Sequence, residues 1–128
     1  MKKTNLAAML LALSIVTSAA YADITLKSKE EVEGVWKLQY TKNSLTDKVS
    51  IEREDTWVFK DGKVTILHIP REDKYYDQPP VNYEIEDGKL KVALLGSNRF
   101  DVFSVIEKDD NRMILKGKFG SYSYFIKK

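Results

Sequence analysis

The chain has 128 residues, with 21 lysines and arginines against 19 aspartates and glutamates and no cysteine, and its formal net charge is +2. Without cysteine it can form no disulfide, no thiolate zinc site and no lipidated cysteine. Its charges are interspersed rather than gathered in a single-sign run, which argues against a binding surface for nucleic acid or for an anionic membrane. The length fits one domain that must be stabilised by its apolar core.

The first residues have the order of a cleavable export signal. Lys2 and Lys3 precede the apolar run LAAMLLALSIV, and the small-residue segment that follows ends in AYA at Ala22. The apolar run is short for a membrane span, so a retained anchor or a buried helix is the weaker alternative. We therefore expect residues 1–22 to be a signal peptide and residues 23–128 to be the mature domain, with a periplasmic or secreted location and no stable membrane anchor. Without the signal peptide the domain has 19 basic and 19 acidic residues and is formally neutral.

The mature domain has the pattern of a β protein. Ser28 followed by Glu31 matches a capping box and predicts a short helical turn. From Gly34 onward, apolar residues recur with a period of two, which predicts strands. The predicted strands cover residues 35–41, 49–60, 63–69, 81–86, 89–95, 100–107, 112–117 and 121–127. Eight strands with no long helix between them predict an all-β fold, an eight-stranded antiparallel up-and-down barrel that hides its sheet edges.

Two dipeptides mark tight hairpin turns in this pattern. Asp61-Gly62 and Asp87-Gly88 suit a type I′ turn, because that turn needs positive φ at both central residues. Alternate connections of an up-and-down barrel lie at opposite ends. The tight turns should therefore close one end, and the longer connections should gather at the other, which we call the loop end.

The longest of these connections covers residues 70–80. It contains Tyr75 and Tyr76, two large rings with no obvious core face, and ends in Pro79-Pro80. Long loops in compact domains are usually functional or mobile, and the alternative is a tolerated surface insertion. We expect this loop to overhang the mouth of the barrel and to contact a ligand or partner.

The Asp61-Gly62 turn also sets which residues face each other across the hairpin. It places Asp55 opposite His68 on the apolar side, with Arg53 nearer the mouth on the same face. Such groups are costly to bury unless they satisfy one another or meet a ligand, so they are candidates for anchoring the polar head of an apolar ligand. Two alternative explanations give these residues no role in binding. A bulge between Arg53 and Asp55 could turn them to solvent, or Asp55 and His68 could simply satisfy each other.

The first strand begins with EGVWKLQY, in which Gly34 and Trp36 follow a short lead-in, and the chain ends in YSYFIKK. These segments resemble the first and last strands of the lipocalin superfamily and its compact bacterial lipocalin-like domains, which have a calycin-type barrel. The resemblance covers nearly all of the mature chain and implies that Trp36 plugs the closed end. Three features depart from the family: the chain is shorter, it lacks a C-terminal helix, and it has no clear counterpart of the arginine that packs on this tryptophan.

The interior of such a barrel has room for its own side chains or for one small ligand. Trp36, Trp57, Phe59 and Tyr83 are predicted to point inward. Aromatic residues at strand spacing are more typical of a filled core than of a ligand cage.

Catalysis is not indicated. The chain has a single histidine, no serine in a nucleophile elbow, no EF-hand spacing and no phosphate-binding glycine loop. We therefore expect no enzyme activity, no cofactor and no metal.

We predict a monomeric, exported, non-catalytic barrel that binds a small, largely apolar molecule through its loop end. The candidate ligand-binding residues are Arg53, Asp55, His68, Tyr75, Tyr76 and Tyr83. The alternative is a protein-binding or inhibitor module that uses the barrel as a scaffold and the 70–80 loop as its contact surface.

The leader generates the first testable prediction. Cleavage after Ala22 makes Asp23 the first residue of the exported protein. Intact-mass measurement of the protein from its native host should give the mass of residues 23–128. A mass that still includes Met1 would restore the anchor interpretation.

Overall fold

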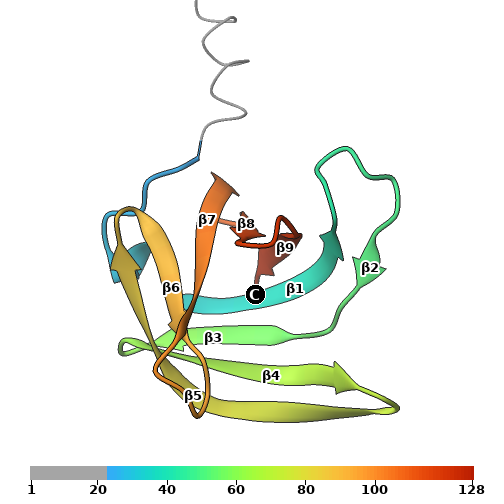
Figure 1. The fold of residues 1–128 in the computed structure, drawn as a ribbon, viewed down its shortest axis with the longest axis horizontal. Helices are drawn as coiled ribbons and strands as arrows, with labels where there is room; N and C mark the ends of the chain where they lie inside the picture. Colours follow the sequence, from blue (N-terminus) through green and yellow to red (C-terminus); the bar gives the residue numbers. More distant parts are fainter. Residues whose placement is uncertain (1–22) are drawn as a thin grey trace, which may run out of the picture.

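In the computed structural model, which describes residues 23–128, one antiparallel sheet closes into a barrel (Figure 1). Its elements are η1, a 3₁₀ turn (Lys29–Glu31), and the strands β1 (Gly34–Lys42), β2 (Ile51–Glu52), β3 (Thr56–Lys60), β4 (Lys63–Arg71), β5 (Lys74–Glu86), β6 (Lys89–Ala93), β7 (Phe100–Lys108), β8 (Arg112–Gly117) and β9 (Tyr122–Lys127). Each strand from β3 to β9 pairs with the next, and β9 pairs with β1. The predicted signal peptide lies outside the described residues.

The predicted eight-stranded barrel is confirmed. β2 and β3 both pair with β1, so they are two halves of one bent strand that is interrupted at residues 53–55. The predicted strand over residues 49–60 therefore exists, but with a break. The predicted helical turn before the first strand is η1.

The tight turns and their register are also confirmed. Asp61 and Asp87 have φ of 53° and 54°, and the glycine after each is also at positive φ, as a type I′ turn requires. Phe59 pairs with Val64, as predicted from the turn. The remaining pairs that confirm the register are Trp57 with Ile66, Tyr83 with Val92 and Ile85 with Leu90.

The predicted 70–80 loop is wrong. β4 continues to Arg71 and β5 starts at Lys74, so these residues form a long two-stranded ribbon with a two-residue turn (Figure 1). Pro79 and Pro80 lie inside β5, where proline is tolerated because this part of the strand is an edge: among the described residues, β5 pairs with β6 only from Tyr83 onward. Two register shifts in the β4–β5 ladder accommodate the irregular residues.

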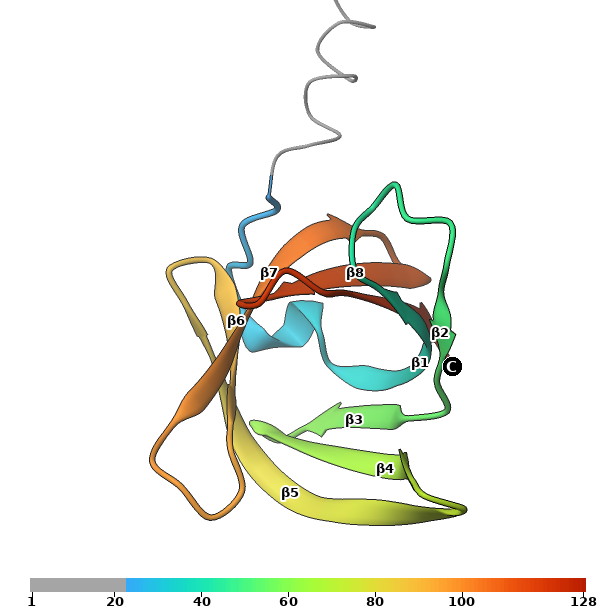
Figure 2. The same ribbon diagram turned by 45° about the vertical axis from the view of Figure 1, so that its right-hand side comes forward.

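The chain before β1 closes the tight-turn end of the barrel (Figure 2). The backbone N–H of Leu26 donates to the carbonyl of Gly88, and the Trp36 Nε1–H donates to the carbonyl of Val32 at 2.8 Å. Leu26, Val32 and Trp36 are all buried. Trp36 thus ties the lead-in segment to the core, in the position that was predicted for it.

Lys127, near the end of β9, contacts both the Trp36 ring and the lead-in segment. Its Nζ lies 4.5 Å from the centroid of the Trp36 ring and donates to the carbonyl of Glu33 at 2.8 Å. Gly34 makes room for this side chain, because a Cβ there would lie 2.7 Å from Lys127 Nζ, and its φ of 122° also favours glycine. Lys108 Nζ also lies near this ring, 5.7 Å from its centroid.

The interior is filled by large side chains. Those with almost no exposure are Trp36, Tyr83, Phe59, Phe125, Leu90, Met113, Leu115, Val32, Val64 and Val105. They come from every strand of the barrel wall except β2, as well as from the lead-in segment, and they form one continuous core.

The closed end generates a stability prediction. Lys127→Met should lower the free energy of unfolding by about 1 kcal/mol, because it removes a cation–π contact and a hydrogen bond to a carbonyl. Urea unfolding followed by far-UV circular dichroism measures this change. Lys118→Met is the matched control, since Lys118 lies 5.1 Å from the Phe119 ring in an exposed turn and has no such anchor. Equal effects of the two changes would contradict the closing role of Lys127.

Candidate functional site

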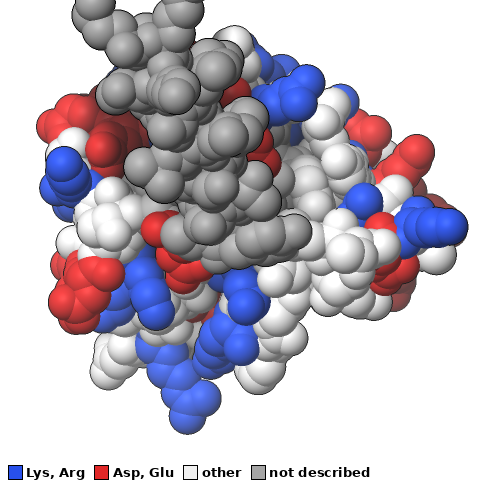
Figure 3. Space-filling model, turned by 90° about the horizontal axis from the view of Figure 1, so that it is seen from above, with Lys and Arg blue, Asp and Glu red and all other residues white. Residues whose placement is uncertain are grey.

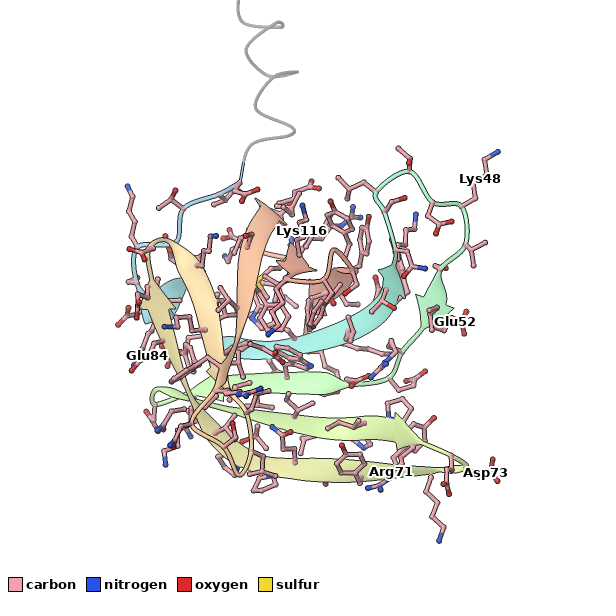
Figure 4. All side chains as sticks on the ribbon, viewed as in Figure 1. Lys48, Glu52, Arg71, Asp73, Glu84 and Lys116 are labelled. Atoms are coloured by element: carbon pink, nitrogen blue, oxygen red, sulfur yellow. The ribbon has the colours of Figure 1, made fainter. Side chains whose placement is uncertain are left out.

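The loop end carries the longer connections of the barrel. In an antiparallel meander, alternate connections lie at the same end, so the segments after β1, β4, β6 and β8 share it. They cover residues 43–50, 72–73, 94–99 and 118–121. Figure 4 shows Lys48 and Asp73 pointing away from the barrel at the tips of the first two.

Most of the exposed large apolar side chains of residues 23–128 lie toward this end. Among the described residues, the exposed large apolar side chains at the loop end or on the ribbon that leads to it are Leu45, Val49, Ile51, Tyr75, Tyr76, Leu95 and Phe119. Phe119 is 91% exposed and Val49 70%. The remaining exposed large apolar residue, Ile24, lies in the lead-in segment at the opposite end. Single exposed apolar residues are ordinary, but their concentration at one end indicates a contact surface.

The β4–β5 ribbon brings three of the predicted residues to this surface. Tyr75 and Tyr76 are exposed and, as consecutive strand residues, point to opposite faces of the ribbon. The His68 ring lies 6.3 Å from Tyr75, edge to face, and the Arg71 guanidinium lies 5.6 Å from the centroid of Tyr76. The two tyrosines are therefore presented by a paired ribbon rather than by a loop.

The predicted pairing of Asp55 with His68 inside the barrel is wrong. His68 is exposed and has a φ of 57°, and its backbone N–H donates to Oδ1 of Asp77. The β3–β4 ladder follows the predicted register as far as Thr56 and Leu67, and the irregular backbone at His68 then turns that side chain outward.

Asp55 is paired with Arg53 instead. Arg53 donates from Nε to Oδ1 at 2.8 Å and from Nη2 to Oδ2 at 2.9 Å, which is a bidentate ion pair. Asp55 is 4% exposed, whereas a third of the Arg53 side chain reaches solvent. The hydrogen bond to Asp55 raises the pKa of Arg53, although partial burial acts in the opposite direction. The break in the strand thus leaves the carboxylate buried and satisfied, and it does not turn both groups to solvent.

Tyr83 belongs to the closed end and does not join the other predicted residues. It is 1% exposed, packs edge-on against Phe59 with a centroid distance of 5.0 Å, and its hydroxyl donates to the carbonyl of Lys29 at 3.5 Å. Burial raises its pKa, and Glu33 and Glu30 add to the effect. Its position indicates a core role.

Trp57 is an inward residue with a buried polar atom that lacks a partner among the described residues. Its ring packs against Phe125 and Phe103 at centroid distances of 5.1 and 5.9 Å. Its Nε1–H is buried and has no hydrogen-bond partner in residues 23–128. Such a donor is costly to bury unpaired. Alternation predicted the inward ring, whereas only the packed neighbours decide whether its N–H finds an acceptor.

Neither sign of charge dominates the four connections of the loop end, whose charged residues are Asp47, Glu72, Asp73, Lys48, Arg99 and Lys118. Acidic and basic side chains are interspersed on the face seen in Figure 3. Within residues 23–128 there is no cluster of three or more histidine, aspartate or glutamate side chains suited to a metal ion. The same residues contain no helix with the length and hydropathy of a membrane span.

The comparisons support the fold alone. No protein-family model matches the chain, and no curated protein matches it. A crystal structure of an uncharacterized protein from Bacteroides eggerthii DSM 20697 is similar, with a TM-score of 0.60 and 16% sequence identity over 75% of this chain and 98% of that one. The chain is thus an eight-stranded antiparallel barrel that is compatible with a calycin-type fold.

The Arg53–Asp55 ion pair and the outward position of His68 together generate a prediction for two double-mutant cycles. The cycle of Arg53→Met with Asp55→Asn should show a coupling energy of about 1–3 kcal/mol, because charge-assisted hydrogen bonds join the two groups. The cycle of Asp55→Asn with His68→Gln should be additive within about 0.5 kcal/mol. Urea unfolding of the single and double variants measures both. A large coupling in the second cycle would contradict the outward position of His68.

Proposed function

We propose that the mature domain is an exported, non-catalytic, lipocalin-like barrel that binds a protein partner with its loop end. The observation that carries the proposal is the concentration of exposed apolar side chains there, including Phe119, Val49 and Tyr75. Solvent-exposed aromatic and aliphatic residues are costly to present to water, and aromatic residues are enriched among the energetic anchors of protein interfaces.

The filled interior favours a surface function over a ligand cavity. Trp36, Phe59, Tyr83 and Phe125 occupy the barrel with almost no exposure, and Trp57 packs against them. A small molecule would have to displace close-packed rings, whereas a partner on the loop end displaces only water. The paired β4–β5 ribbon also presents Tyr75 and Tyr76 at little entropic cost.

Kinship with the lipocalins has two supports in this chain. Gly34 and Trp36 match the motif at the start of the first strand. Lys127, on the last strand, packs on Trp36 as the arginine of that family does, and it also donates to a carbonyl of the lead-in segment.

A second candidate, binding of a small apolar molecule, is favoured by one observation. The unpaired Nε1–H of Trp57 lies inside the barrel, on the residue two positions from the Asp55–Arg53 pair. A ligand with one acceptor atom could satisfy this donor if the surrounding rings moved apart.

Site-specific photo-crosslinking in the native host tests the proposed function. Benzoylphenylalanine at position 119 or 76 should give a discrete protein adduct, because these side chains lie on the loop end. The same amino acid at position 24 or 84 should give none, because Ile24 lies in the closing segment and Glu84 on the outer wall of β5 (Figure 4). Adducts of equal yield from all four positions, or from none, would count against the loop end.

The captured partner allows a quantitative test. Phe119→Ser should weaken binding of the partner at least ten-fold, about 1.4 kcal/mol, without changing the melting temperature, because the side chain is exposed.

Native mass spectrometry of the domain from its host distinguishes binding of a small molecule from binding of a protein partner. A bound molecule of a few hundred daltons that is lost in Trp57→Phe would favour the small-ligand function instead.

A further inference from the structure

The outer wall of the barrel carries a pocket that is distinct from the loop end. It has a volume of about 370 Å³, within the range of ligand sites, and lies across β8, β9 and β1. Ile114 and Tyr124 line it from positions next to the buried Met113 and Phe125, so these two side chains point outward by strand alternation.

Two irregularities of the sheet lie at this pocket. The β1–β9 ladder shifts register between Leu38 and Tyr40, and the β7–β8 ladder shifts between Val105 and Glu107. Both shifts place a lining residue on the outer face: Tyr40 in the first case and Glu107 in the second. Bulges re-aim side chains and are frequent beside functional sites.

The pocket has an aromatic wall. Tyr40 and Tyr124 lie opposite each other on β1 and β9, stacked at a centroid distance of 4.5 Å and an interplanar angle of 11°. Lys42 Nζ lies 5.8 and 5.7 Å from the two centroids and helps to hold the pair. Partial burial raises the pKa of Tyr124, with Tyr40, Glu107 and Tyr122 adding to it. A tyrosine hydroxyl is neutral near pH 7 and can both donate and accept.

The polar lining of the pocket and of its neighbour is balanced in charge. Gln39, Glu107 and Arg112 line the pocket beside the tyrosines, and a second hollow of about 350 Å³ shares Gln39 and Tyr40 with it. The charged residues that line the two hollows are Glu52, Glu54 and Glu107 against Lys37, Arg53 and Arg112. With three charges of each sign, the surface has no net attraction for an anion or a cation.

We propose that these two hollows form a binding site for a neutral oligosaccharide. Aromatic faces attract the C–H groups of a pyranose ring, since the ring face carries the negative part of the quadrupole. Amide, carboxylate and guanidinium groups supply paired donors and acceptors that suit neighbouring hydroxyls. The continuity of the two hollows through Gln39 and Tyr40 leaves room for more than one sugar unit.

An extended peptide fits this wall less well. Strand addition needs an unpaired sheet edge, whereas the wall at this pocket is made of strands that are already paired on both sides, β8 with β7 and β9, and β9 with β8 and β1. Recognition at the first hollow must therefore come from side chains, which suits a sugar chain. At the second hollow β2 pairs, within residues 23–128, with β1 alone, so an extended peptide is the competing occupant that the test below includes. This site does not depend on the protein-binding function of the loop end.

The test is a screen of residues 23–128 against an array of neutral gluco-, manno-, galacto- and xylo-oligosaccharides of four to six units. Isothermal titration with the best oligosaccharide should show saturable one-to-one binding. Tyr124→Ala should weaken it at least ten-fold, and Glu107→Gln and Arg112→Gln at least three-fold. The last two side chains are exposed, so these variants keep the test valid if Tyr124→Ala does not fold.

Glu84→Gln is the matched control, because it removes a carboxylate from the outer wall of β5, outside both hollows, and should leave binding unchanged. The proposal is overturned by no saturable binding to any neutral oligosaccharide at 10 mM. It is equally overturned by binding that none of the three pocket variants weakens, or by tighter binding of an anionic polysaccharide such as polygalacturonate or of an unstructured peptide.

Discussion

The anchoring of Trp36 is the interaction on which the rest of the barrel depends. Its Nε1–H bonds to the carbonyl of Val32, and Lys127 contacts its ring from the last strand while bonding to the carbonyl of Glu33. One side chain thus joins the lead-in segment, β1 and β9, where the first and last strands must meet for the sheet to close. A closed sheet has no exposed edge at that seam, so closure also protects the domain from edge pairing.

The positions of the polar side chains are decided by breaks in the strand pattern. The gap between β2 and β3 allows Arg53 to reach Asp55 within one bent strand. The left-handed backbone of His68 turns its ring to solvent, toward Tyr75. The shift after Leu38 places Tyr40 against Tyr124 on the outside. Regular alternation would have placed His68 and Tyr40 on the inner face, so the irregular backbone beside these two residues decides which side chains reach the surface.

Because aromatic rings fill its interior, this barrel offers surfaces more readily than a cavity. The loop end exposes apolar side chains among charged ones, whereas the wall over β8, β9 and β1 combines a tyrosine pair with balanced charges. These chemistries suit different partners: dehydration of exposed apolar side chains favours a protein surface, and stacking with paired hydrogen bonds favours a polyhydroxylated chain. The two surfaces adjoin, because Ser50 and Glu52 line the second hollow and flank Ile51 of the loop end.

By itself, the sequence determined the features that local chemistry controls. Turn dipeptides with positive φ set two hairpins and their register, and period-two patterning identified the eight strands and the inward Trp36, Phe59 and Tyr83. The tertiary structure alone decided the features that depend on which strands are neighbours in the sheet. From sequence alone, Pro79 and Pro80 predict a loop. Only the structure shows that they lie in a part of β5 that does not pair with β6, where proline is tolerated. Lys127 meets Trp36, and Tyr40 meets Tyr124, across more than 80 residues, and no local pattern encodes that closure.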